Sequence, residues 1–95
     1  MDIKHHESGH KGLFYYKKDT HHIAELSYTV AEDEHIVLEH TSVVEEFRGQ
    51  GLGKSLIYYA VEYVRQNNLE ILPKCPYAKS VFRRYPDLQD VISKE

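Results

Sequence analysis

The sequence predicts a small α+β domain with a mixed sheet, in the order β-β-β-α-β-α. Three observations support this fold class. Segments with alternating or aromatic-rich composition, joined by short links, come first in the chain. A glycine-rich loop and a strongly amphipathic segment follow them. A short apolar segment comes next, and a helical crossover would place it parallel to the third strand.

Three segments have the composition of strands in an antiparallel meander. The first, 12–18, is rich in aromatic residues. Apolar and polar residues alternate along the second, 22–30, except for Ile23 at its start. A short acidic connection, 31–34, is expected to form a hairpin turn to the third strand, 35–44.

Two later segments have helical periodicity. The first, 51–66, gathers its apolar residues on one broad face, which should pack against the sheet. The second begins at Pro76, a residue that suits the first turn of a helix, and ends near Pro86. Between the two helices, 69–74 is expected to form the fourth strand, and 87–92 to add one more helical turn.

The loop before the long helix holds three alternate glycines, Gly49, Gly51 and Gly53. Glycines spaced in this way let the backbone turn and bring several N–H groups to one point. The helix that follows adds its own unpaired N–H groups and the positive end of its dipole. The sequence therefore predicts a phosphate or pyrophosphate site at this loop.

Spacing separates the phosphate loops that could occur here. A Walker A loop needs a glycine five positions before Gly53, where this chain has Arg48. The dinucleotide fingerprint also fails, because the third glycine arrives one residue early. The residues instead follow an Arg/Gln-x-x-Gly-x-Gly/Ala pattern, which resembles the acetyl-CoA motif of the GNAT N-acetyltransferase superfamily. They are Arg48, Gly49, Gln50, Gly51, Leu52 and Gly53.

More narrowly, the chain is similar to a group of very small predicted GNAT-type acetyltransferases. The shared features, besides the loop, are Gly12-x-Phe14, Ala24-Glu25-x-x-Tyr28, His40-Thr41-x-Val43 and Cys75-Pro76-Tyr77. The resemblance implies a GNAT-like core and an acetyl-CoA donor. The implied acceptor is an amine-bearing small molecule or protein. Larger members place helices between their first two strands, and these wall the acceptor site. This chain has only a tight turn there, so a non-catalytic acyl-CoA-binding module, or a subunit that needs a partner, is the alternative.

The resemblance also implies which residues hold the coenzyme. The end of the third strand would lie along the pantetheine arm, and the loop amides would meet the pyrophosphate. Arg48 and Lys54 would add charge-assisted contacts. The implied coenzyme-binding residues are Ser42, Val43, Val44, Arg48, Gly49, Gln50, Gly51, Leu52, Gly53 and Lys54.

Cys75 is the candidate nucleophile. It lies at a strand end, just before a helix amino terminus and next to Lys74, and both surroundings favour the thiolate. In a GNAT-like arrangement the third and fourth strands splay apart, with the acetyl thioester in the opening beside Cys75. The cysteine could then carry a transient acetyl group, or only pack while the amine attacks directly.

Two other residues are candidates for proton transfer. His40 is the preferred general base, because its unperturbed pKa lies near neutrality. Glu39 is the other candidate base, and strand alternation places it on the opposite face from His40. Tyr77 could give a proton to the departing CoA thiolate, as tyrosines near this point do in some GNAT enzymes.

Length and charge set the remaining expectations. Ninety-five residues allow one small domain, 1–95. Its polar segment 1–11 is expected to be flexible. Histidines in that segment lack a clear carboxylate or cysteine to complete a site, so no metal is expected. A net charge of −3 argues against nucleic-acid binding. The sequence has no run of about 18 apolar residues, so we expect no membrane span.

The single cysteine excludes an intramolecular disulfide and fits a reducing cytoplasm. We therefore expect a cytoplasmic protein that is a monomer or a weak homodimer.

Overall fold

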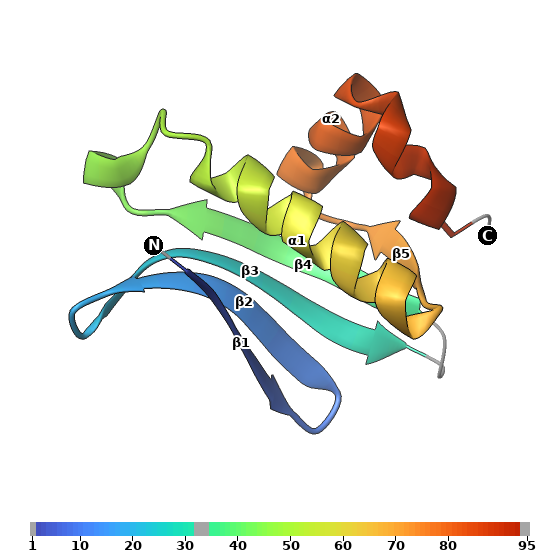
Figure 1. Ribbon diagram of the computed structural model, residues 1–95, viewed down its shortest axis with the longest axis horizontal. Helices are drawn as coiled ribbons and strands as arrows, with labels where there is room; N and C mark the ends of the chain where they lie inside the picture. The colour runs from blue at the N-terminus through green and yellow to red at the C-terminus, as the bar shows by residue number, and fades with distance from the viewer. Residues whose placement is uncertain (1, 32–34, 94–95) are drawn as a thin grey trace.

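One sheet of five strands, ordered β1-β2-β3-β4-β5, forms the base of the fold (Figure 1). This computed structural model describes residues 2–31 and 35–93. The first four strands pair antiparallel, and β5 pairs parallel with β4. The predicted mixed α+β fold class is confirmed. The acidic turn expected at 31–34 lies largely outside the described residues. The strands are β1 (Ile3–Ser8), β2 (Lys11–Lys18), β3 (His21–Ala31), β4 (His35–Val43) and β5 (Glu70–Pro73).

The helices lie across this sheet, with α1 in front of β4 and α2 beside α1 (Figure 1). The buried side chains of α1 recur at helical spacing and pack into the core beneath it. The amphipathic face predicted from the sequence is therefore confirmed. No helix among the described residues is long and apolar enough to cross a bilayer. The helical elements are η1 (Glu45–Phe47), α1 (Leu52–Asn67), α2 (Pro76–Arg84) and η2 (Pro86–Val91).

The amino-terminal strand β1 corrects the expectation that segment 1–11 is flexible. It pairs with β2 from Ile3 to Ser8. The ring of His5 stacks on Phe14 at 4.3 Å, and its Nε2 is hydrogen-bonded to the Tyr28 hydroxyl at 2.6 Å. These contacts come from strands β2 and β3, so the polar composition of the segment did not reveal them. The observed order is β-β-β-β-α-β-α.

Gly12 is a glycine because Tyr28 crosses directly over it. A Cβ at this position would lie 2.0 Å from Cζ of the Tyr28 ring. The absent side chain lets this ring reach the His5 imidazole from β3, across β2. Gly12 and Tyr28, two of the features shared with small GNAT-type proteins, therefore serve the fold.

A β-bulge explains the irregular start of β3. Tyr16 pairs with Ala24, whereas Lys17 pairs with His22, so Ile23 is an extra residue in the strand. Ile23 and Ala24 are both buried, although they are consecutive. The break in alternation seen in the sequence is this bulge.

Candidate functional site

The two halves of β4 have different neighbours. Residues 35–38 pair with β3 on one edge and with β5 on the other. The carbonyl of Leu38 then accepts hydrogen bonds from the backbone N–H groups of Lys74 and Cys75, both at 3.0 Å. Beyond Leu38 the strand pairs with β3 alone among the described strands. The edge of β4 that faces α2 is therefore open from residue 39 onward.

Two residues direct their backbone groups to this open edge. Val44 donates its N–H to the Ile23 carbonyl in β3, at 2.9 Å. Backbone groups of successive residues point to alternate edges of a strand. The N–H and C=O groups of Val43 and Thr41 therefore point away from β3, where another extended chain could pair with them.

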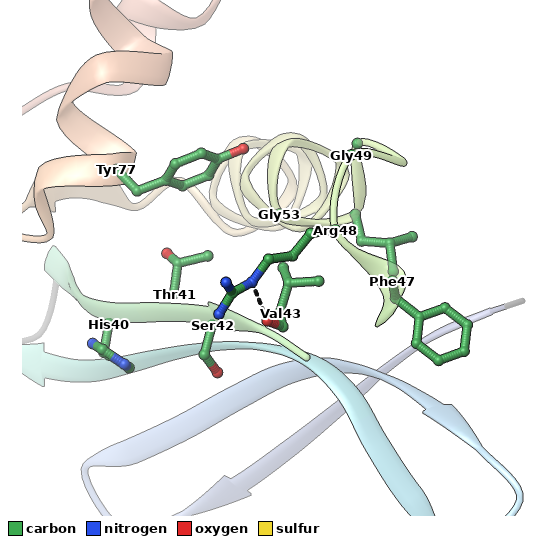
Figure 2. A pocket seen from close by; sticks show the side chains of 11 residues that line it. His40, Thr41, Ser42, Val43, Phe47, Arg48, Gly49, Gly53 and Tyr77 are labelled. Atoms are coloured by element: carbon green, nitrogen blue, oxygen red, sulfur yellow. Dashed lines mark hydrogen bonds between the residues drawn. The ribbon is translucent and has the colours of Figure 1, made fainter. Parts of the chain in front are cut away.

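A cleft of about 610 Å³ lies along the open edge (Figure 2). β4 forms one wall, the glycine loop and the start of α1 form another, and Tyr77 closes one end. The structure brings most of the predicted site residues together here and adds Thr41 and Phe47. The lining residues are His40, Thr41, Ser42, Val43, Phe47, Arg48, Gly49, Gly51, Leu52, Gly53 and Tyr77.

The three glycines of the loop have two different roles. Gly49 and Gly51 have φ angles of +84° and +78°, in the left-handed region that favours glycine. Gly53 belongs to α1 and is not in this region. A Cβ on Gly53 would lie 3.1 Å from Cε2 of Tyr77, so the missing side chain makes room for that ring.

The amino terminus of α1 offers unpaired donors to the cleft. Its first helical hydrogen bond runs from Ser55 N–H to the Gly51 carbonyl, at 3.0 Å. The N–H groups of residues 52–54 precede that bond and have no carbonyl in an earlier turn. The first turn carries no acidic side chain. The positive end of the helix is therefore available to an anion.

Three predicted coenzyme residues do not line the cleft. Lys54 donates a hydrogen bond from Nζ to the Tyr85 hydroxyl at 3.2 Å, and the same nitrogen lies 4.4 Å from the centre of that ring. Gln50 is exposed. Val44 uses its N–H within the sheet and lines a neighbouring hollow. Among the described residues, Arg48 is thus the cation that lines the cleft.

Cys75 lies behind the cleft wall. Its side chain is buried, with 5% exposed, and its Sγ is 3.5 Å from the hydroxyl of Thr41, which does line the cleft. Burial raises the pKa of the thiol. Hydrogen bonds to the sulfur from the Thr41 side chain and from the backbone of Ala78, Tyr77 and Thr41 outweigh burial, so this pKa lies below its ordinary value. The surroundings therefore favour the thiolate.

Tyr77 stands at the end of the cleft nearest Cys75. The chain enters α2 between these two residues, and the Tyr77 ring extends over the start of α1 (Figure 2). Burial raises the pKa of its hydroxyl further than Lys54 lowers it. The phenol is therefore protonated at neutral pH and can donate a hydrogen bond into the cleft.

A second β-bulge changes the placement of His40. Consecutive residues of β3 pair with Leu38 and His40, so Glu39 is extra in β4. Thr29, on the uncovered face of the sheet, donates a hydrogen bond to Glu39 at 2.9 Å. The His40 side chain leaves β4 on the face away from Tyr77 (Figure 2). The expectation that Glu39 and His40 point to opposite faces is therefore wrong.

Thr41 and Phe47 were missed as site residues. Thr41 lies two positions before Val43, so period-two alternation alone would have placed it on the same side of the strand. Phe47 closes η1, a short 3₁₀ turn without a clear sequence signature. Within residues 2–31 and 35–93, no three His, Cys, Asp or Glu side chains form a group that could hold a metal ion.

The mixed sheet, the open edge of β4 beside its parallel neighbour and the glycine loop before α1 define a GNAT-like fold. A family model described as GCN5-related N-acetyltransferase matches residues 13–91. The chain therefore belongs to the GCN5-related N-acetyltransferase family, whose general chemistry is acetyl-CoA-dependent acyl transfer. No curated protein matches the chain.

Solved structures support this assignment. A GCN5-like candidate N-acetyltransferase from Staphylococcus aureus is 35% identical, with a TM-score of 0.76 over 97% of this chain and 87% of that one. An aminoglycoside N-acetyltransferase solved with CoA is 14% identical, with a TM-score of 0.64 over 87% of this chain and 88% of that one.

A candidate streptothricin acetyltransferase from Bacillus anthracis, solved with acetyl-CoA, is 16% identical, with a TM-score of 0.60. The match covers 86% of this chain but only 48% of that one. At such low identities, this likeness and the likeness to the aminoglycoside enzyme show the fold alone.

Proposed function

We propose that this chain binds acetyl-CoA in the cleft and transfers the acetyl group to an amine. The observation that carries the proposal is the meeting of an open strand edge with an uncompensated helix amino terminus. The amides of the pantetheine arm would pair with the backbone of Val43 and with the Thr41 carbonyl, since the Thr41 N–H bonds to the Cys75 sulfur. The pyrophosphate would accept hydrogen bonds from the N–H groups of the loop and of the first turn of α1.

This orientation places the thioester near Cys75. With the pyrophosphate at Gly51, the arm runs along β4 toward Thr41 and Tyr77 (Figure 2). The Cys75 thiolate attacks the acetyl carbonyl carbon and forms a new C–S bond. The C–S bond to coenzyme A breaks, and the coenzyme leaves as a thiolate. The acceptor amine then attacks the acetyl-cysteine, loses a proton and regenerates the thiolate.

Tyr77 assists the departing sulfur by a hydrogen bond. An ordinary thiol has a pKa of about 8.5 and an ordinary phenol about 10. The pKa of Tyr77 is raised further, so complete proton transfer to a thiolate is unfavourable. A hydrogen bond from the phenol stabilises the leaving thiolate without that transfer.

The acceptor would reach the acetyl group from the uncovered face of the sheet. His40 lies on that face, where Glu39 also lies with Lys74 Nζ at 3.8 Å. The imidazole is exposed, so it can take a proton from an incoming ammonium group. We therefore keep His40 as the proposed general base.

A second candidate function is a non-catalytic acyl-CoA-binding module, or a subunit whose partner completes the acceptor site. Two observations favour it. Cys75 is buried behind Thr41, and the described helices leave one face of the sheet uncovered, on the side where the acceptor would bind. The proposals of a single domain, a cytoplasmic location and a monomer or weak dimer are compatible with both functions.

Titration with CoA and acetyl-CoA, followed by NMR or calorimetry, tests the proposed donor site. We expect the amide signals of residues 41–43 and 49–54 to move most. If the protein ignores both ligands, or if other residues respond, the site is wrong.

Mass spectrometry after incubation with acetyl-CoA tests the covalent step. We expect one added acetyl group on the wild type and none on Cys75→Ser. Turnover of an amine panel by Cys75→Ser at the wild-type rate would show direct transfer. Donor binding without turnover by the wild type, even with co-purifying proteins present, would favour the non-catalytic module.

A further inference from the structure

The side chain of Arg48 is exposed and lines the cleft (Figure 2). Its Nε donates a hydrogen bond to the carbonyl oxygen of Val43, at 3.0 Å. The guanidinium leaves the loop next to Gly49 and extends across the open edge of β4 toward Ser42. Arg48 thus connects the glycine loop to β4. A donor that binds along β4 would have to break this connection.

This hydrogen bond uses a group that the donor needs. The carbonyl of Val43 points to the open edge, where an amide of the pantetheine arm would pair with it. The guanidinium lies against the same stretch of backbone. An arm packed along β4 and an arginine packed there cannot occupy that space together. Donor binding in this position requires Arg48 to leave Val43.

A phosphate next to the loop offers Arg48 a stronger partner. The loop that would hold the pyrophosphate begins directly after Arg48, with Gly49 one position and Gly51 three positions later. A contact between guanidinium and phosphate is charge-assisted and about twice as strong as one to a neutral carbonyl. A donor with phosphates compensates for the lost bond to Val43. A thioester without phosphates has to break that bond with nothing in return.

We propose that Arg48 covers the pantetheine groove in the free chain and that the phosphates of the donor draw it away. The inference rests on the proposed function and adds a specificity-determining residue to it. Arg48 favours CoA thioesters and disfavours acyl-pantetheine thioesters, which have the same arm without phosphates.

Replacing Arg48 removes both its hydrogen bond to Val43 and its proposed contact with the phosphates. The first loss should strengthen pantetheine binding, and the second should weaken CoA binding. In Arg48→Ala, calorimetric titration should show CoA binding about tenfold weaker, because a charge-assisted contact is lost. Binding of pantetheine should become about two- to tenfold tighter, because the competing hydrogen bond to Val43 is gone. Arg48→Gln gives a second variant if the alanine variant does not fold.

Arg83→Ala is the matched control, since Arg83 is an exposed arginine of α2 and its loss changes the net charge equally. We expect it to leave both affinities unchanged. If Arg48→Ala weakens both ligands, or leaves pantetheine binding unchanged, Arg48 does not cover the groove, and the proposed function survives. If the wild type does not bind CoA, the proposed function itself is wrong and this inference falls with it.

Discussion

The first and second halves of β4 perform different tasks within one strand. Residues 35–38 pair on both edges, and three of the four are buried. Residues 40–43 pair on one edge only and line the cleft. The first half satisfies its backbone groups inside the protein, whereas the second leaves some of them for another molecule. In the proposed function, the donor is recognised through backbone groups that have no strand partner within the sheet.

The largest difference between the halves should appear in stability. Leu38 is 0% exposed, so Leu38→Ala should lower the free energy of unfolding by about 2–5 kcal/mol through the cavity that it creates. Thr41→Ala, in the open half, should cost less than about 1 kcal/mol. Urea unfolding of both variants measures this contrast, and equal losses would show that the halves do not differ.

The next effect concerns the loop that faces the open half. Gly51→Ala places a methyl group at a φ of +78°, which strains the turn by about 1–2 kcal/mol and moves its N–H groups. CoA affinity should fall more than about tenfold, because several hydrogen bonds weaken together.

Gly9→Ala is the control for this backbone strain. Gly9 has a φ of +61° and open space around it, in the turn between β1 and β2. Gly9→Ala should lose about as much stability as Gly51→Ala, while its CoA affinity should stay at the wild-type value. A similar loss of affinity in both variants would place the coenzyme elsewhere.

A proline scan sharpens the comparison at the level of single backbone groups. Val43 directs its N–H to the open edge, so Val43→Pro should leave the sheet intact and weaken CoA binding by about two- to tenfold. Ser42 directs its N–H to β3, so Ser42→Pro should mainly reduce stability. Thermal unfolding of both variants measures the change in stability, and CoA titration measures the change in affinity. Equal destabilisation would contradict the assigned edge directions.

The smallest expected effect is a change in the pKa of Cys75, which lies beside β4 between Leu38 and Thr41. Thr41 lowers the pKa of the Cys75 thiol by its hydrogen bond. Thr41→Val should raise that pKa, so less thiolate is present at a given pH. The alkylation rate plotted against pH should then move to higher pH. Ser42→Ala removes a neighbouring hydroxyl on the other face and should not move the curve. An unmoved curve for Thr41→Val would exclude this role of Thr41.

Features fixed by nearby residues could be predicted from the sequence. The long helix, expected at 51–66, runs from Leu52 to Asn67. Its limits follow from a glycine in the left-handed conformation before it and from Asn68, with φ of +55°, after it. The glycine loop could be predicted in the same way, because the spacing of its three glycines can be read within a few residues.

Features fixed by distant partners could not be predicted. β1 depends on Phe14 and Tyr28 for its packing, although its own residues are polar. The bulge at Glu39 depends on the strand that pairs with β4. Lys54 turns to Tyr85, 31 residues further along the chain. In each case the deciding contact comes from another strand or helix, and the periodicity of a single segment does not show it.

The Leu38 carbonyl, which accepts hydrogen bonds from the amides of both Lys74 and Cys75, ties the backbone at Cys75 to the sheet. Fraying of α2 from its carboxyl end would therefore leave the thiol in register with the strand. The position of the Cys75 thiol is a property of the backbone scaffold, and substitution of the surrounding side chains can change its pKa without relocating it.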